Sequence, residues 1–392
     1  MYAEHVGVYM VKIIQMLAVS LILVCASGAA RAGDYEDGDA AARRGDYATA
    51  LKLLSPLAHK GDPRAQNNLG IMYLQGHGVA QDYKEAVRWY RLAADQGFAK
   101  ARYNLGLMYD QGHGVAQDYK QAVRWYRAAA DQGLAQAELK LGVMYHEGLG
   151  VAQDYKEAVR WCRAAAEQGN APAQYNLGFM YDQGHGVAQD YKEAVRWYRL
   201  AAEQGDARAQ YNLGVMYVEG QVVAQDHKEA LRWYRLSADQ GLAQAQFNLG
   251  SMYYIGNGVA QDYKEAVRWY RLAADQGLAW AQGNLGGMYY LGYGVAQDYK
   301  EAAKWSRLAA AQGDAEAQFG LGLMYGQGHG VAQNDAHAYM WYNLAAASLS
   351  GDQLKNATSM RELASKDMTS AQIAQAQEMA RKCQESNFKN CD

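Results

Sequence analysis

The chain has 392 residues and a formal net charge of −3; half of its residues are hydrophobic and a fifth are charged. This composition is typical of a protein that folds rather than of a disordered chain, and the small negative charge argues against a nucleic-acid-binding protein that relies on a basic surface. Four cysteines are too few for a fold of this length to be held together by disulfides.

The N-terminal segment has the layout of a secretory signal peptide. Lys12 precedes an apolar run over residues 13–25, and the small residues of Ala30-Arg31-Ala32 follow it. The run is too short to span a membrane, and no transmembrane segment is expected after cleavage. Residues 1–32 are therefore predicted to be removed after Ala32, which indicates a bacterial protein that is periplasmic or secreted. A lipoprotein attached through Cys25 and a cytosolic protein with an apolar N-terminal helix are the alternatives.

Residues 33–61 read as a divergent helical hairpin, with Gly45 and Asp46 at its turn. Terminal elements of a repeat array need a polar outer face for solubility. This hairpin is predicted to cap the N-terminal end of the array that begins at Asp62.

A segment of 36 residues starts at Asp62 and recurs without insertion, so that eight repeats fill residues 62–349. A fixed period of this length is the mark of a solenoid, in which each repeat packs only on its neighbours. Apolar residues at helical spacing predict a first helix over repeat positions 2–14, and the aspartate at position 21 is the expected N-cap of a second helix. Glycine at position 15 and, in all repeats except the fifth with its Val222, at position 17 is expected to turn the chain between them. The predicted fold is all-α, built from antiparallel helix pairs.

The residues that recur carry a family resemblance. In the first repeat they are Ala65, Leu69, Gly70, Met72, Tyr73, Gly76, Gly78, Val79, Asp82, Ala86 and Trp89. This pattern is similar to the Sel-one-like repeat (SLR), a relative of the tetratricopeptide repeat (TPR), and it occurs eight times in phase. The resemblance implies a right-handed superhelical α-solenoid that holds a protein or peptide partner in its concave groove. Some cysteine-rich SLR proteins have been linked to β-lactam binding or hydrolysis; this chain lacks their disulfide in each repeat, so a β-lactam-hydrolysing enzyme is the weaker alternative.

Residues 350–392 are predicted to form C-terminal capping helices. Thr369 and Gln372 have the spacing of a capping box that opens the last helix. Cys383 and Cys391, eight residues apart, are expected to form a disulfide that pins the tail to this helix; two free thiols are the alternative. Cys162 takes a recurring core position and is expected to be a buried thiol, whose reactivity stays open.

No pattern typical of a catalytic site is present, such as a nucleophile elbow, a zinc-protease motif or a P-loop. A histidine recurs at position 16 in half of the repeats, as His77, His113, His185 and His329. Packed helices lie about 8–10 Å apart, whereas zinc needs its ligands at about 2 Å, so side chains one repeat apart are poorly placed to share an ion. We therefore expect a structural or solvent-exposed role for these histidines, with no metal and no cofactor.

Eight repeats in one chain act as an internal alignment. Positions 4, 8, 9, 11, 12, 15 and 18 are invariant, whereas positions 3, 6, 10 and 13 vary. The spacing of the variable positions places them on one side of the first helix, which we call the variable face. By the TPR resemblance this face lines the concave groove. Its predicted binding residues are Tyr103, Asp110, Tyr175, Phe179, Asp182, Tyr211, Phe247, Tyr254, Trp280, Tyr290 and Phe319. The alternative is that position 6 packs adjacent repeats together.

The nine tryptophans divide into two groups. Eight occupy position 28, one in each repeat, and are expected to be core residues. The ninth, Trp280, lies at position 3 of repeat seven and has no counterpart, so it is the strongest single candidate for a binding residue. Because rows of aromatic side chains also suit sugars, a glycan- or peptidoglycan-binding module stays open as an alternative function. The identity of the partner and the oligomeric state do not follow from the sequence.

Overall fold

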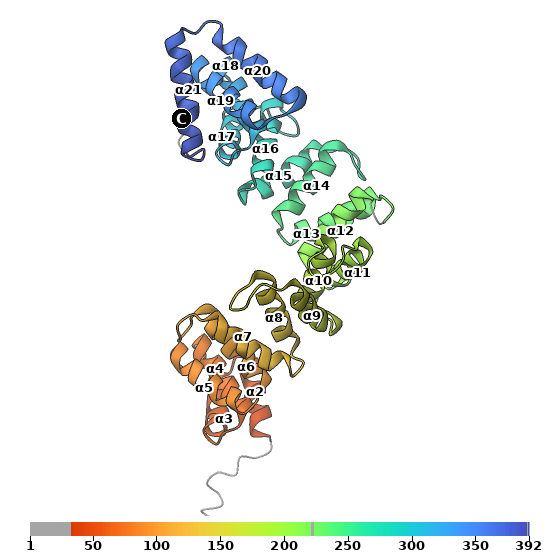
Figure 1. Ribbon diagram of the computed structural model, residues 1–392, viewed down its shortest axis with the longest axis vertical. Helices are drawn as coiled ribbons and strands as arrows, with labels where there is room; N and C mark the ends of the chain where they lie inside the picture. Colours follow the sequence, from red (N-terminus) through yellow and green to blue (C-terminus); the bar gives the residue numbers. More distant parts are fainter. Residues whose placement is uncertain (1–32, 221–222, 390, 392) are drawn as a thin grey trace, which may run out of the picture. The chain divides into compact units, whose positions relative to one another are not determined.

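The computed structural model describes residues 33–220, 223–389 and 391, which contain 20 helices, α2 to α21, and no strand (Figure 1). The predicted signal peptide, residues 1–32, lies outside this described part. The chain divides into two compact bodies: the first runs up to Ala173 and includes 185–187, and the second comprises 174–184 and the residues from Ala188 onward. Within the described residues no helix is both long enough and apolar enough to cross a membrane.

The first body is a succession of helix pairs in which each helix contacts the next (Figure 1). The N-terminal hairpin consists of α2 (Asp34–Arg43) and α3 (Tyr47–His59). The first three repeats follow as α4 (Pro63–Gln75) and α5 (Tyr83–Asp95), α6 (Ala99–Gln111) and α7 (Tyr119–Ala130), and α8 (Ala135–Glu147) and α9 (Tyr155–Glu167).

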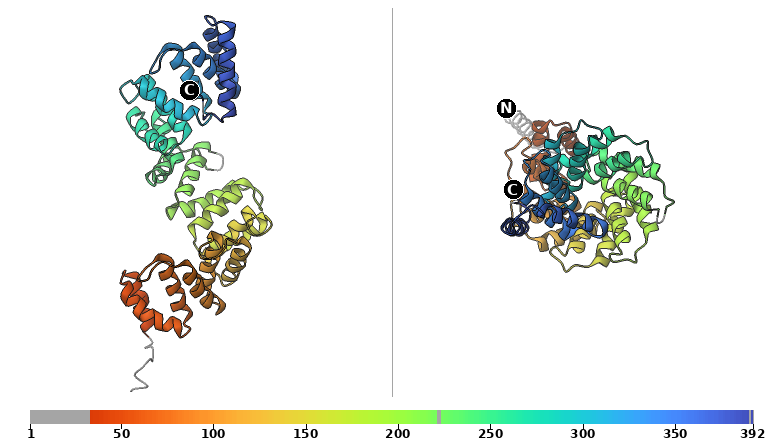
Figure 2. Two further views of the ribbon diagram at one scale, coloured as in Figure 1. Left: turned by 90° about the vertical axis from the view of Figure 1, so that its left-hand side faces the viewer. Right: turned by 90° about the horizontal axis from the view of Figure 1, so that it is seen from above.

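The second body holds most of α10 (Ala171–Gln183) and all of the later helices, and Figure 2 shows their succession from two further sides. From α11 to α19 each helix contacts the next, and both α20 and α21 contact α19. These helices are α11 (Tyr191–Glu203), α12 (Ala207–Glu219), α13 (His227–Asp239), α14 (Ala243–Ile255), α15 (Tyr263–Asp275), α16 (Ala279–Leu291), α17 (Tyr299–Ala310), α18 (Ala315–Gln327), α19 (Asp335–Ser348), α20 (Gly351–Ser365) and α21 (Ser370–Glu385).

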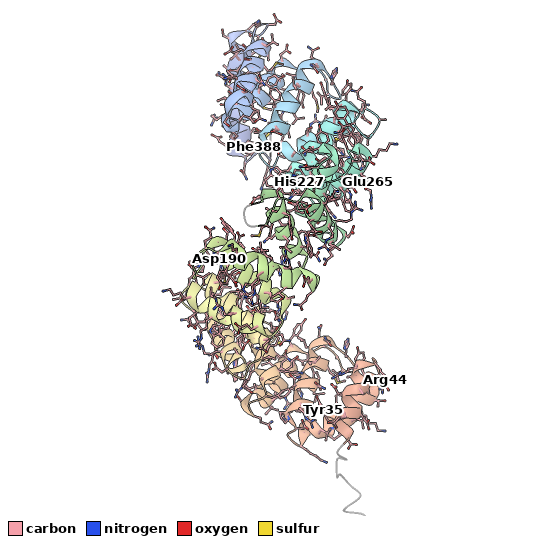
Figure 3. All side chains as sticks on the ribbon, turned by 90° about the vertical axis from the view of Figure 1, so that its right-hand side faces the viewer. Tyr35, Arg44, Asp190, His227, Glu265 and Phe388 are labelled. Atoms are coloured by element: carbon pink, nitrogen blue, oxygen red, sulfur yellow. A yellow bond between two sulfur atoms is a disulfide. The ribbon has the colours of Figure 1, made fainter. Side chains whose placement is uncertain are left out.

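The predicted signals for helix ends are confirmed. Helix α4 covers positions 2–14 of its repeat, and Gly76 ends it in the left-handed conformation, at φ 71°. The side chain of Asp82 accepts hydrogen bonds from the backbone N–H groups of the first turn of α5. Asp190, labelled in Figure 3, does the same for α11, and Thr369 forms the capping box of α21 with Gln372.

The invariant residues form the core. Seven of the eight tryptophans at position 28 are buried, and Trp125 is partly buried. The glycine at position 9 is invariant because the residue at position 29 lies against it: a Cβ would stand 2.6 Å from a ring carbon of Tyr90 at Gly70, and 2.6 Å from the hydroxyl of Ser306 at Gly286. Where that tyrosine is replaced by Cys162, the thiol is fully buried, and burial raises its pKa to about 12.

Glutamine side chains join successive repeats. The amide nitrogen of Gln66 donates to the carbonyl oxygen of Ala58 in the preceding hairpin at 3.1 Å, and its own oxygen accepts from the amide of Gln96 at 2.7 Å. The same pair of bonds recurs in the second body. Repeat three has Glu138 in place of the first glutamine; its carboxylate accepts from Gln168 at 2.7 Å, and burial raises its pKa. We call this recurring arrangement the glutamine seam.

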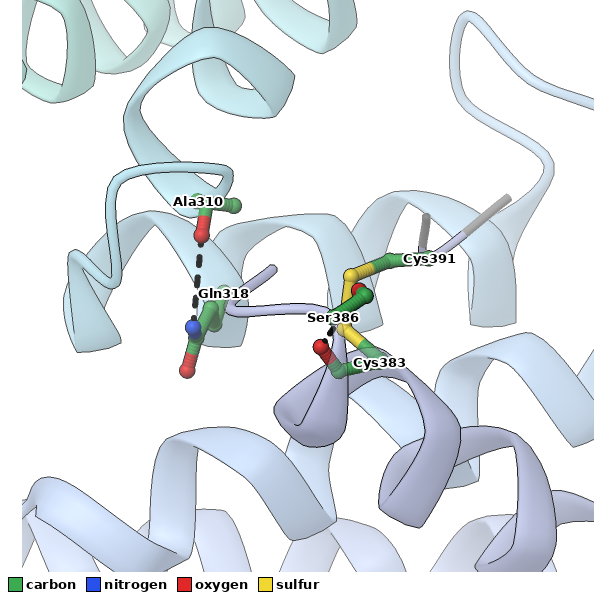
Figure 4. Close-up of a disulfide and its surroundings, with 5 residues drawn as sticks. All are labelled: Ala310, Gln318, Cys383, Ser386 and Cys391. Atoms are coloured by element: carbon green, nitrogen blue, oxygen red, sulfur yellow. Dashed lines mark hydrogen bonds between the residues drawn. A yellow bond between two sulfur atoms is a disulfide. The ribbon is translucent and has the colours of Figure 1, made fainter. Parts of the chain in front are cut away.

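The C-terminal tail is tied to α21. In the structure a disulfide joins Cys383 to Cys391, whose Cα atoms lie 4.6 Å apart, and the hydroxyl of Ser386 donates to the carbonyl oxygen of Cys383 at 2.8 Å (Figure 4). Cys383 is buried, and Phe388 packs against the same hydrophobic cluster. The tail therefore covers apolar surface at the end of the array.

Candidate functional site

The aromatic residues at position 6 of the variable face are half-buried. Each lies against the tyrosine at position 29 of its own repeat, with ring centroids 5.5–5.9 Å apart. The pairs are Tyr103 and Tyr126, Tyr175 and Tyr198, Tyr211 and Tyr234, Phe247 and Tyr270, and Phe319 and Tyr342. These side chains contribute to packing inside a repeat and offer only part of their surface to a partner.

The two predicted aspartates also support these tyrosines. The hydroxyl of Tyr126 donates to Asp110 at 3.1 Å, and Lys140 of the next repeat lies 3.8 Å from the same carboxylate. In the second body the hydroxyl of Tyr198 donates to Asp182 at 3.4 Å. Burial, with the charge of Asp110 as a smaller cause, raises the pKa of Tyr126. Phe179 is half-buried beside the cluster that holds Tyr198.

Four of the predicted residues converge on one cavity of about 790 Å³ in the second body. Phe247 and Tyr254 come from α14, and Trp280 and Tyr290 come from α16; further lining residues come from α15, α17 and α18. Trp280 is 62% exposed, and its ring lies 6.0 Å from that of Phe247. We call this space the repeat-seven cavity.

The cavity exists because repeat seven lacks the aromatic pair found in five other repeats. It has Gly283 at position 6 and Ser306 at position 29, and both line the cavity. Two further lining residues, Gly287 and Gly320, have open space where a Cβ would stand. The sequence analysis missed Gly283 and Ser306, although the joint loss of two aromatic residues in one repeat was a readable signal.

The lining combines apolar, aromatic and acidic groups. Asp314 and Glu316 line the cavity, and no lysine, arginine or histidine does. One oxygen of Asp314 accepts from the backbone N–H of Ala317 at 2.8 Å, and burial raises the pKa of this carboxyl. Glu316 accepts from the amide of Gln353 at 2.7 Å. Such a site suits a group that is apolar along its length and cationic at its tip.

The recurrent histidines at position 16 stack on a tyrosine of the preceding helix pair, at ring-centroid distances of 4.1–4.8 Å. The stacked pairs are Tyr47 and His77, Tyr83 and His113, Tyr155 and His185, and Tyr299 and His329. In repeat seven, Tyr293 takes the place of the histidine and stacks on Tyr263. Over the described part of the chain, no three histidine, cysteine or acidic side chains are grouped as a metal ion would require.

The family model of the Sel1 repeat matches the chain nine times, at residues 26–62, 63–98, 99–134, 135–170, 171–206, 207–242, 243–278, 281–314 and 315–348. The first of these matches covers the segment expected to be a capping hairpin. A search of curated proteins gave no match.

Two of the solved structures that resemble the chain are proteins of the same repeat type. A protective antigen from uropathogenic Escherichia coli, described as displaying an SLR fold, is 35% identical; the alignment covers 87% of this chain and 81% of that one, with a TM-score of 0.58. A Sel1 repeat protein from Oxalobacter formigenes is 40% identical over 62% of this chain and 99% of that one, also with a TM-score of 0.58.

Proposed function

The chain belongs to the Sel1 repeat family, and we propose that it is an exported scaffold that binds a protein or peptide along the variable face and catalyses no reaction of its own. Repeats of this family generally form protein-interaction scaffolds. The observation that carries the proposal is the repeat-seven cavity, where Phe247, Tyr254, Trp280 and Tyr290 meet. An exposed tryptophan beside an apolar hollow is the usual anchor of a protein interface.

Replacing Trp280, Tyr254 and Tyr290 together by alanine is expected to weaken partner binding by about 100-fold or more, since truncating interface aromatics typically costs several kcal/mol. The measurement is a titration of the partner recovered from exported proteins with the immobilised mature chain. The matched control replaces Leu236, Leu272 and Leu308, which are exposed on the second helices of the same body. Unchanged binding by the triple alanine variant would mean that the binding site does not lie on the variable face.

A glycan is the second candidate, because the aromatic side chains of the cavity could also stack on sugar rings. Sedimentation with purified peptidoglycan separates the two functions. If the mature chain sediments with peptidoglycan and the triple alanine variant does not, glycan binding replaces protein binding as the function of the variable face.

Export is supported by the signal-peptide layout of residues 1–32 and by the pairing of Cys383 with Cys391, which needs an oxidising compartment. We expect protein recovered from the periplasm or medium to have the intact mass of a chain that begins at Gly33. Non-reducing peptide mapping should recover the two cysteines in one linked peptide. A mass that retains residues 1–32, or two free thiols in that material, would contradict the respective claim.

A further inference from the structure

The chain contains an internal example of how an arginine is held between neighbouring repeats. In repeat five, Arg208 lies 3.0 Å from the carboxylate of Asp206, and its guanidinium carbon stands 4.1 Å above the ring of Tyr175 in the repeat before. An aspartate at position 1 and an aromatic ring of the preceding repeat thus enclose one guanidinium. Both contacts favour arginine, whose planar cation stacks on rings and pairs with carboxylates.

The N-terminal end of the array repeats this arrangement. Arg64 lies 3.0 Å from the carboxylate of Asp62, and its guanidinium carbon stands 4.0 Å above the ring of Tyr35. Burial acts to raise the pKa of Asp62, but the hydrogen bonds from Arg64 and from the backbone of Ala65, together with the charge of Arg64, outweigh it, so that the pKa is lowered. At Asp62 the neighbouring arginine therefore favours the ionised carboxylate.

Repeat eight has the aspartate without the arginine. Asp314 occupies position 1, but Glu316 stands at position 3, where repeats one and five have arginine. The pKa of Asp314 is raised, chiefly by burial and to a smaller extent by the charge of Glu316. A carboxylate oxygen of Asp314 lies 3.7 Å from the place where a Cβ on Gly283 would stand, and both residues line the repeat-seven cavity.

The cavity supplies the other half of the arrangement. Trp280 and Phe247 provide aromatic faces, and Leu291 and Leu323 provide apolar surface for a hydrocarbon stem. We propose that the repeat-seven cavity receives an arginine side chain of the partner polypeptide, whose guanidinium pairs with Asp314 and Glu316 and packs against the aromatic wall. This inference rests on the proposed function and names the chemistry of the partner. The partner supplies the cation that repeats one and five carry themselves.

The decisive variant is Glu316→Arg, which gives repeat eight the arginine of repeats one and five. The new guanidinium is expected to pair with Asp314 and so to occupy the place of the partner's arginine. Its matched control is Gln244→Arg, which adds an arginine at the same position of repeat six, where position 1 is Leu242 and no aspartate is present. Gln244 and Glu316 are both exposed, so both variants are expected to fold. A second blocking variant, Gly283→Tyr with Ser306→Tyr, restores the aromatic pair found in five other repeats.

The probe is a library of random twelve-residue peptides displayed on phage and selected on the full mature chain. Peptides retained by the wild type and by Gln244→Arg, but lost from both blocking variants, should be enriched in arginine. In a synthetic peptide of this set, replacing that arginine by citrulline, its neutral analogue, should weaken binding about tenfold or more. Bound peptide should also lower the pKa of Asp314, as measured by carboxyl NMR.

Three results would overturn the inference: retained peptides without arginine, a citrulline peptide that binds as tightly, or equal retention by the blocking variants. If one of these results is found and the triple alanine variant of Trp280, Tyr254 and Tyr290 nevertheless fails to retain the peptides, the proposed function stands and only the arginine assignment fails. If the wild type and the triple alanine variant select the same peptides, the proposed function and the arginine assignment both fail.

Discussion

Trp269→Ala should destabilise the second body by about 3–5 kcal/mol, whereas Trp280→Ala should leave its stability nearly unchanged. Trp269 is only 3% exposed and belongs to the buried cluster that includes Leu249 and Tyr270. Its indole nitrogen has no hydrogen-bond partner, so the expected loss is one of packing and of the cavity left behind. Trp280 projects into solvent, and no other repeat has an aromatic residue at its position.

The two substitutions form a matched pair because the same atoms are removed from neighbouring repeats. Urea denaturation followed by circular dichroism measures the free energy of unfolding of each variant. Equal losses would make Trp280 a packing residue between repeats and would withdraw it from the binding surface. A small loss for Trp269 would mean that the recurrent tryptophans are not the core residues that the structure describes.

Gly294→Ala should cost about 3 kcal/mol or more, much more than Gly277→Ala. Both glycines have positive φ, 71° and 90°, so alanine pays the left-handed penalty of about 1–2 kcal/mol at either site. At Gly294, however, the new Cβ would stand 2.2 Å from the carbonyl oxygen of Tyr263 in the preceding repeat, whereas at Gly277 it would meet nothing within 4 Å. Backbone cannot yield as a flexible side chain does, so the joint between the repeats must open.

Thermal unfolding of the two glycine variants compares these costs directly. A larger fall in the unfolding midpoint for Gly294→Ala attributes the difference to close contact between repeats. If the two midpoints fall equally, the glycine at position 17 is required for its backbone conformation alone.

The helices could be predicted from the sequence because the same apolar spacing and the same helix-capping residues recur in eight copies. The residue at position 21 is the N-cap of the second helix in all eight repeats, as Asp82 and Asp190 illustrate. The variable face was also predictable, since substitution among repeats marks positions that the core does not constrain. The burial of the position-6 side chains could not be predicted. Tyr103 contacts Tyr126, 23 positions later, and only the packing of the two helices brings these residues together.

The cavity shows a different limit of sequence reasoning. Trp280 and Tyr290 could be predicted as binding residues because their side chains are large and aromatic. The hollow beside them depends on Gly283 and Ser306, which matter because of the atoms that they lack. Likewise, the role proposed for Glu316 follows only from a comparison with Arg208, which stands at the same position of repeat five and pairs with Asp206.

The glutamine seam has a consequence for the history of the gene. Because Gln210, Gln246 and Gln282 make the same bonds at successive joints, a recombination event that removes or duplicates one of these periods joins two surfaces that already fit. The reading frame survives, since a period is a whole number of codons. Length can therefore change in single steps without a new interface having to evolve, while one copy, such as repeat seven, is free to diverge toward a particular ligand.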